Sequence, residues 1–254
     1  MKRFHQLAAA LLVAAAAAPL AAQAQDTQAP DSWPRQSFEE APQRVWIAEI
    51  EATERGFRIG NPDADGQLIE FISYTCGHCA SFVKEAGPTL ELVAVAPGHL
   101  AIEVRPVIRN GLDLAITQLA RCGGPERFKD LHDMFLYTQE TWLPKAAGAP
   151  ASQQAIWMRG DATGRLNAAR ALDFDDMATQ RGLTMPQITA CLSDDADAKA
   201  ILAAGEADRT EFNVKGTPTF ALNGETLEGV YSWPQLSQVL QERVSTTPPS
   251  ADSE

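Results

Sequence analysis

Residues 68–80 have the sequence LIEFISYTCGHCA, and this stretch decides the fold. Its first seven residues are mostly apolar or aromatic, which predicts a buried strand. The residues that follow the second cysteine favour a helix, so Cys76 and Cys79 lie at a strand-to-helix junction. The first turn of a helix leaves backbone N–H groups unpaired and carries a partial positive charge, which stabilises an anion. We therefore expect the pKa of Cys76 to lie below that of a free thiol.

This cysteine pair favours redox chemistry over the two structural alternatives. A structural zinc site needs four ligands, which usually come from two clusters, and the other two cysteines, Cys122 and Cys191, do not form a second close pair. A purely structural disulfide is disfavoured because a four-residue loop removes little chain entropy. We interpret Cys76 as the nucleophile and Cys79 as the resolving thiol. His78 would add to the stabilisation of the thiolate, and no metal is expected.

Composition and the N-terminus indicate an exported, acidic protein. The chain has 254 residues and a formal net charge of −12, which argues against nucleic acid or an anionic membrane as a partner. A basic start, an Ala/Leu/Val run over 7–20 and the sequence Ala-Gln-Ala at 22–24 predict a secretory signal peptide over residues 1–24. The apolar run is too short to be a good membrane span. An exported chain meets an oxidising compartment, where disulfides form.

The sequence predicts an α/β domain that is interrupted by helices. Residues 25–43 are a polar, proline-containing flexible lead, and 245–254 a disordered tail. A helix over 77–95, bent at Pro88, followed by a strand over 100–107 predicts a parallel strand–helix–strand crossover. Residues 112–192 carry helical spacing only and form the predicted insertion, with Trp142 and Trp157 in its core. The α/β domain then comprises 44–111 and 193–244.

Cys122 and Cys191 lie near the two ends of this predicted insertion. In an exported protein we expect them to form a structural disulfide, and two buried free thiols are the alternative reading. A crosslink over so long a loop would stabilise the fold by about 4 kcal/mol on the chain-entropy view.

A second informative stretch is VKGTPTFALNG, residues 214–224. The Thr217–Pro218 bond is a candidate cis peptide. The stretch predicts a strand over 219–222, a hairpin turn at 223–224 and a returning strand over 226–229. Helices are expected on both sides of it, over 194–212 with Ile201 and Leu202 toward the core, and over 232–244 with Ser232 as N-cap.

Together, residues 70–79, the inserted helices and residues 214–220 resemble the thioredoxin superfamily, and within it the DsbA-like periplasmic thiol:disulfide oxidoreductases. The resemblance covers roughly residues 45–244. It implies a thioredoxin fold with an inserted α-helical domain, in an enzyme that needs no cofactor. It also implies that Cys76 is exposed and Cys79 buried. Pro218 would be a cis-proline packed against the disulfide, and the Thr217 backbone would bind the substrate chain.

The resemblance assigns a role to Glu70, six residues before Cys76. It matches a buried acid that assists proton transfer at Cys79 in the family, and an ordinary solvated strand carboxylate is the alternative. Its apolar neighbours favour burial.

Two departures leave the direction of the reaction open. Gly77 and His78 stand where the best-known oxidases of the family have Pro-His, and Thr217 stands where they have Val. Both changes lie beside the sulfur atoms, where thiolate stability sets the redox potential. We expect an oxidase that introduces disulfides into unfolded or partly folded exported proteins and is reoxidised by a DsbB-like membrane partner. The alternatives are a disulfide isomerase or reductase and, less favoured, a non-enzymatic thiol or metal-handling module. We expect a monomer.

Overall fold

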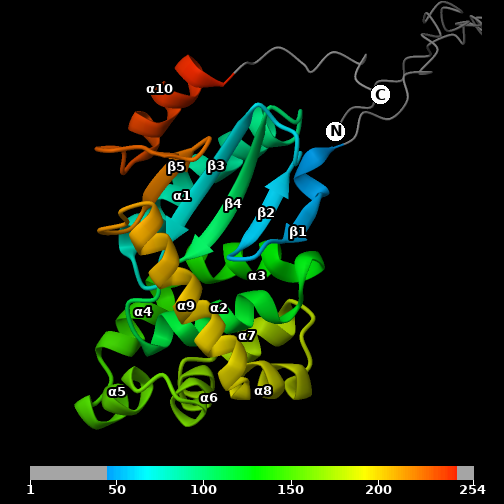
Figure 1. Ribbon diagram of the computed structural model, residues 1–254. Coiled ribbons are helices and arrows are strands. Elements are labelled where there is room, and N and C mark those ends of the chain that lie inside the picture. Colours follow the sequence, from blue (N-terminus) through cyan, green and yellow to red (C-terminus); the bar gives the residue numbers. More distant parts are fainter. Residues whose placement is uncertain (1–44, 245–254) are drawn as a thin grey trace, which may run out of the picture. The chain divides into compact units, whose positions relative to one another are not determined.

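The computed structural model describes residues 45–244, and the predicted signal peptide, flexible lead and C-terminal tail lie outside the described residues. Within residues 45–244 the strands form one six-stranded sheet in the order β1-β2-β4-β3-β5-β6 (Figure 1). The strands are β1 (Ile50–Ala52), β2 (Phe57–Gly60), β3 (Gly66–Ile72), β4 (Leu100–Pro106), β5 (Thr219–Leu222) and β6 (Glu225–Thr226). A short 3-10 helix, Trp46–Ala48, precedes β1.

Strand β3 lies at the centre of the sheet and carries the motif at its C-terminal end. It pairs in parallel with β4, with Leu68 opposite Ile102, and antiparallel with β5, with Leu68 opposite Leu222. Helix α1 (Gly77–Leu90) connects β3 to β4, so the predicted parallel crossover is confirmed. The chain stays α-helical through Pro88 and continues as a π-helix over Glu91–Val95.

Side chains of β3 alternate between two apolar layers, as a pleated strand requires. Ile69 and Phe71 pack in a smaller cluster with Phe212 and Val214. Leu68 and Ile72 face the main core, where apolar side chains of α1 and the helical segment pack against the sheet. Glu70 has the same parity as Leu68 and Ile72, and its side chain therefore enters the main core.

Between β4 and β5 the described chain is helical. Helix α2 begins at Gly111, where the Asn110 side chain caps it by accepting from two backbone N–H groups, and packs against α3, α6 and α8. Trp142 and Trp157 are each 2% exposed, which confirms their predicted place in the core. The helices are α2 (Gly111–Cys122), α3 (Pro125–Tyr137), α4 (Gln139–Ala147), α5 (Ala151–Met158), α6 (Ala162–Ala171), α7 (Phe174–Gln180), α8 (Met185–Ser193) and α9 (Asp195–Glu211).

These helices and the sheet share the main hydrophobic cluster. The predicted α/β domain (44–111 and 193–244) and the predicted insertion (112–192) therefore do not have separate hydrophobic cores. Their division remains a prediction that describes the order of the segments along the chain. Over residues 45–244, no helix is both long enough and apolar enough to cross a membrane.

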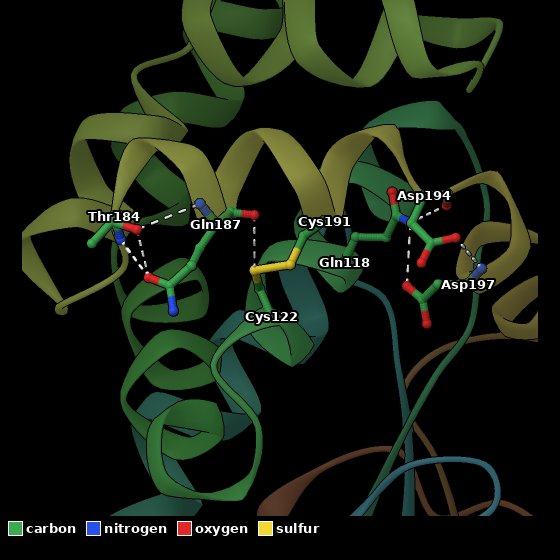
Figure 2. The surroundings of a disulfide bond; sticks show 7 residues. All are labelled: Gln118, Cys122, Thr184, Gln187, Cys191, Asp194 and Asp197. Carbon is green, nitrogen blue, oxygen red and sulfur yellow. Dashed lines mark hydrogen bonds between the residues drawn. A yellow bond between two sulfur atoms is a disulfide. The ribbon is translucent and has the colours of Figure 1, made fainter.

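Cys122 and Cys191 are joined by a disulfide with an S–S distance of 2.00 Å (Figure 2). The bond links the last residue of α2 to α8, across a sequence separation of 69 residues. Hydrogen bonds support α8 and α9 beside it: Thr184 and Gln187 form a capping box at the start of α8, and the Gln118 amide donates to the Asp194 carbonyl oxygen at 2.9 Å. The contact of α2 with α8 is thus fixed covalently as well as by packing.

The C-terminal part differs from the prediction in three details. The hairpin turn forms at Asn223 and Gly224, whose φ values of 52° and 82° suit a tight two-residue turn, but β6 contains only Glu225–Thr226 and is shorter than expected. Ser232 occupies the N-cap position of α10 (Trp233–Arg243), yet its hydroxyl donates to the Gln235 side chain rather than accepting a capping bond. In α9, Ile201 is buried, whereas Leu202 is 47% exposed because it lies on the outer face.

Candidate active site

The four motif residues lie at the start of α1, directly after the turn that leaves β3. Cys76 is the N-cap residue in extended conformation, and Gly77, His78 and Cys79 form the first turn of the helix. The loop before β5 approaches from the other side. Cys76 Sγ lies 3.2 Å from the Thr217 carbonyl oxygen, which accepts a hydrogen bond when the thiol is protonated, and the Thr217–Pro218 peptide bond is cis. The two stretches that the sequence singled out therefore meet at one sulfur atom.

The two thiols have opposite acid–base properties. The pKa of Cys76 is lowered to about 5, first by a hydrogen bond from the Cys79 thiol, and further by backbone N–H groups of Cys79 and His78 at the start of the helix. Cys79 is fully buried, and this burial raises the pKa of its thiol. At neutral pH, Cys76 is therefore a thiolate and Cys79 a thiol when the pair is reduced.

Cys76 is less accessible than expected. The resemblance implied an exposed nucleophile, but the residue is only 5% exposed. The reason is the contact with the loop before β5, which covers the sulfur atom on one side. Cys76 lies instead against a cleft of about 570 Å³ that His78 and Thr217 also line. A reacting chain would reach the sulfur through this cleft.

Asp113, in the first turn of α2, fixes the segment that precedes Cys76, and the sequence analysis missed it. Its carboxylate is fully buried. One oxygen accepts from Ser73 Oγ and from the Thr75 backbone N–H, both at 2.9 Å. The other oxygen accepts from Thr75 Oγ1 and from the Arg109 backbone N–H, both at 3.0 Å. No local motif could have revealed this role, because Ser73 and Thr75 are 40 and 38 residues away in the chain.

We expect Asp113→Asn to lower the free energy of unfolding by about 2 kcal/mol. In the variant an NH2 group takes the place of one carboxylate oxygen, which accepts two hydrogen bonds in the wild-type protein. An amide can accept through one atom only, so the backbone N–H of Thr75 or of Arg109 would lose its partner. Urea unfolding of the oxidised protein measures the change, with the exposed Asp130→Asn in α3 as control. A loss no larger than that of the control would contradict the role of Asp113.

Gln139, the first residue of α4, also holds the motif from a distance. Its buried amide donates to the carbonyl oxygens of Tyr74 and Cys76, at 2.6 and 3.0 Å. Tyr74 is further tied to α3, because its hydroxyl and His132 Nδ1 are hydrogen-bonded at 3.0 Å. Burial lowers the pKa of His132 to about 3, so this imidazole is neutral. The predicted insertion thus holds the motif segment through hydrogen bonds to its backbone and to the Tyr74 hydroxyl.

Glu70 is 5% exposed, in keeping with burial rather than with a solvated strand carboxylate. Burial raises the pKa of Glu70 to about 8, and the negative charges of Asp133 and Glu91 add to this. Among the described residues Glu70 has no hydrogen-bond or ion-pair partner. Its side chain borders a cavity of about 40 Å³, which also lies against His132. A carboxyl with these properties holds a proton near neutral pH.

Residues 45–244 contain no cluster of three or more His, Cys, Asp or Glu side chains placed to hold a metal ion. The side chains at the motif that could bind a metal ion are the thiols of Cys76 and Cys79 and the exposed imidazole of His78. A dithiol at the start of a helix, with one stabilised thiolate and a cis-proline loop against it, defines the class of thiol:disulfide oxidoreductases.

Comparison with known proteins supports this class. The thioredoxin family model matches residues 52–242. A solved structure of protein-disulfide isomerase from Novosphingobium aromaticivorans is 35% identical, with a TM-score of 0.70, and the match covers 73% of this chain and 95% of that one. Wolbachia pipientis alpha-DsbA1 shares the fold, with a TM-score of 0.59 at 16% identity over 73% of this chain and 89% of that one.

A curated relative from Rickettsia bellii (strain RML369-C), provisionally named a protein-disulfide oxidoreductase, is 26% identical over 217 residues, 83% of this chain and 73% of that protein. A relative from Rickettsia conorii (strain ATCC VR-613 / Malish 7), named in the same way, is 26% identical over 77% of this chain and 63% of its own length. The chain belongs to the thioredoxin family, as a DsbA-like protein-disulfide oxidoreductase.

Proposed function

We propose that this enzyme is a dithiol oxidase that donates its Cys76–Cys79 disulfide to other proteins. The observation that carries the proposal is the difference between the two thiols: Cys76 is stabilised as a thiolate and Cys79 is not. Stabilising the thiolate stabilises the reduced enzyme, which makes the disulfide a stronger oxidant.

The reaction has two exchange steps. A substrate thiolate attacks Cys76 Sγ, the Cys76–Cys79 bond breaks, and Cys79 leaves with the electron pair and takes up a proton. A second substrate thiolate then attacks the substrate sulfur of the mixed disulfide and releases Cys76 as a thiolate. The substrate loses two electrons and the enzyme gains them. Cys76 is a good leaving group because its pKa is low.

Glu70 and the Thr217 loop have supporting roles in this proposal. The buried carboxyl of Glu70 is protonated near neutral pH and supplies a proton donor on the core side of β3. Strand β5 begins its pairing with β3 at Thr219, so the preceding residues have no strand partner in the described sheet. The backbone at Thr217 is therefore not paired with β3 and lies beside the reactive sulfur. It could form strand-like hydrogen bonds with a substrate segment in extended conformation.

The natural substrates in this proposal are unfolded or partly folded exported proteins, in the periplasm. A membrane oxidoreductase of the DsbB-like kind would accept the two electrons from the reduced enzyme. The exported location is supported by the N-terminal sequence and by the disulfide between Cys122 and Cys191, a bond typical of oxidising compartments.

A second candidate is a disulfide isomerase, which works in the reduced state. It is favoured by the name of the relative from Novosphingobium aromaticivorans and by Thr217, which stands before the cis-proline where the best-known oxidases that this chain resembles have Val. The same Cys76 thiolate would attack an incorrect substrate disulfide, and no net electron transfer would occur.

Two assays on ribonuclease A separate these functions. We expect the oxidised enzyme to restore activity to reduced, unfolded ribonuclease faster than glutathione disulfide does at equal concentration. The reduced enzyme should restore activity to scrambled ribonuclease only weakly. The opposite order would favour the isomerase, and no effect in either assay would overturn both proposals.

A further inference from the structure

The cleft beside Cys76 has a charge opposite to that of the protein. The chain has 33 acidic and 21 basic residues, yet the cleft is lined by Arg109, Arg209, Lys215 and His78 and by no Asp or Glu. These four side chains come from four separate segments: the β4–α2 loop, the end of α9, the loop before β5 and the start of α1. Their convergence is therefore a property of the tertiary structure and not of one basic stretch of sequence.

The cations at the cleft are largely unneutralised by the protein itself. Among residues 45–244, no ion pair involves the side chain of Arg109 or of Lys215. Arg209 has one long contact, 3.5 Å to Glu206, and both side chains are about half exposed or more, so this pair is screened and weak. The nearby carboxylate of Asp113 is fully buried and accepts four hydrogen bonds. The basic groups thus remain available to a ligand.

The lowered pKa of the nucleophile has causes other than these cations. The lowered pKa of Cys76 arises first from the Cys79 thiol, then from a hydrogen bond with Thr217, and then from backbone N–H groups of Cys79 and His78. The side chains of Arg109, Arg209 and Lys215 are exposed and line the same cleft as the sulfur atom. Charges of one sign in a cleft raise the local concentration of oppositely charged partners and increase association rates by roughly 10- to 1000-fold.

We propose that this cleft selects polypeptide segments with acidic side chains beside the reacting cysteine. The inference rests on the proposed thiol–disulfide exchange at Cys76 and names the class of substrate that it acts on. Arg109 and Lys215 are the residues that determine this preference, because each is exposed and has no partner in the described structure. Carboxylates flanking a substrate thiol would pair with them while the thiolate approaches Cys76.

The test uses two peptides, CEEEC and CQQQC, that differ only in charge. The second-order rate constant for reduction of the Cys76–Cys79 disulfide by each peptide is measured by acid quench and mass spectrometry, with the whole mature protein. We expect a preference for the acidic peptide of about tenfold in 10 mM salt. The preference should fall to about twofold in 1 M salt, where the Debye length drops from about 30 to about 3 Å.

Variants assign the effect to the cleft. Arg109→Gln/Lys215→Gln should lower the ratio of the two rate constants at least fivefold. The matched control Lys145→Gln/Lys199→Gln removes two exposed lysines that do not line the cleft, and should leave the ratio within twofold of wild type. Because the same peptides are used throughout, differences in intrinsic thiol reactivity cancel between proteins.

An unchanged ratio in the cleft variant, or an equal loss in the control, would overturn the proposed preference while leaving the exchange reaction intact. If neither peptide reduces the disulfide of the wild-type protein, the proposed function itself fails. The two failures are therefore distinguishable in one data set.

Discussion

Cys76→Ala will reduce oxidation of a dithiol substrate to the uncatalysed rate. Cys79→Ala, mixed with a linear peptide disulfide, will form a lasting mixed disulfide, because Cys76 Sγ attacks the peptide disulfide, one peptide sulfur leaves as a thiolate, and no second enzyme thiol resolves the product. The reason is the asymmetry of the pair. Cys76 borders the cleft and has a pKa near 5, so it is the sulfur that exchanges with substrate. Cys79 is fully buried and its pKa is raised, so it acts only on a disulfide already formed at Cys76.

A fluorescent dithiol peptide measures turnover of the two variants, and mass spectrometry measures the complex that Cys79→Ala forms with the peptide disulfide. The disulfide between Cys122 and Cys191 is the internal control, because both variants retain these cysteines and the same mass measurement shows whether they are bonded. Turnover by Cys76→Ala, or a mixed disulfide formed at Cys79, would contradict the assignment of the nucleophile.

Glu70→Gln will make the stability of the protein less dependent on pH. Burial raises the pKa of Glu70 from 4.5 to about 8 in the folded protein. The folded state therefore binds a proton between these pH values that the unfolded state has lost. The stability that the protonated Glu70 contributes is fully present below about pH 4.5 and is lost progressively as the pH rises through 8.

The Glu70→Gln variant does not lose this stability as the pH rises, because its amide side chain does not ionise. Each pKa unit corresponds to about 1.4 kcal/mol, so the stability of Glu70→Gln relative to wild type should rise by about 3–5 kcal/mol between pH 5 and pH 9. Urea unfolding of the oxidised proteins at the two pH values measures it. The exposed Glu85→Gln in α1 is the control and should show no such rise. An equal difference at both pH values would show that Glu70 is ionised in the folded state.

The sequence was sufficient for the parts of the fold that are encoded locally. The strand before Cys76, the helix after it and the strand after Pro218 each have a continuous apolar pattern and a sharp boundary, and the parallel crossover follows from their order. Both stretches that carry the chemistry were found because each is a short motif. The family resemblance then supplied what spacing alone could not, that they meet in space.

The parts that could not be predicted depend on contacts between distant segments. Asp113 and Gln139 hold the backbone around Cys76 from α2 and α4, and neither has a local pattern that distinguishes it from an ordinary helical polar residue. The low exposure of Cys76 arises from the Thr217 loop, 141 residues away in the chain. Leu202 was wrongly expected in the core, because helical periodicity indicates the buried face only approximately. A shift of one position along the helix is enough to separate the buried Ile201 from the exposed Leu202.

The central claim is that the Cys76 thiolate makes this pair an oxidant. The pKa of Cys76 is about 5, which is about two units below pH 7. Ionisation of this thiol at pH 7 therefore stabilises the reduced form by about 3 kcal/mol, which corresponds to about 60 mV for a two-electron couple. The decisive measurement is the equilibrium reduction potential of the Cys76–Cys79 pair in glutathione buffers, with Cys122 and Cys191 followed separately by mass. We expect a potential well above that of the glutathione couple. A value at or below it would contradict the oxidase and favour the isomerase.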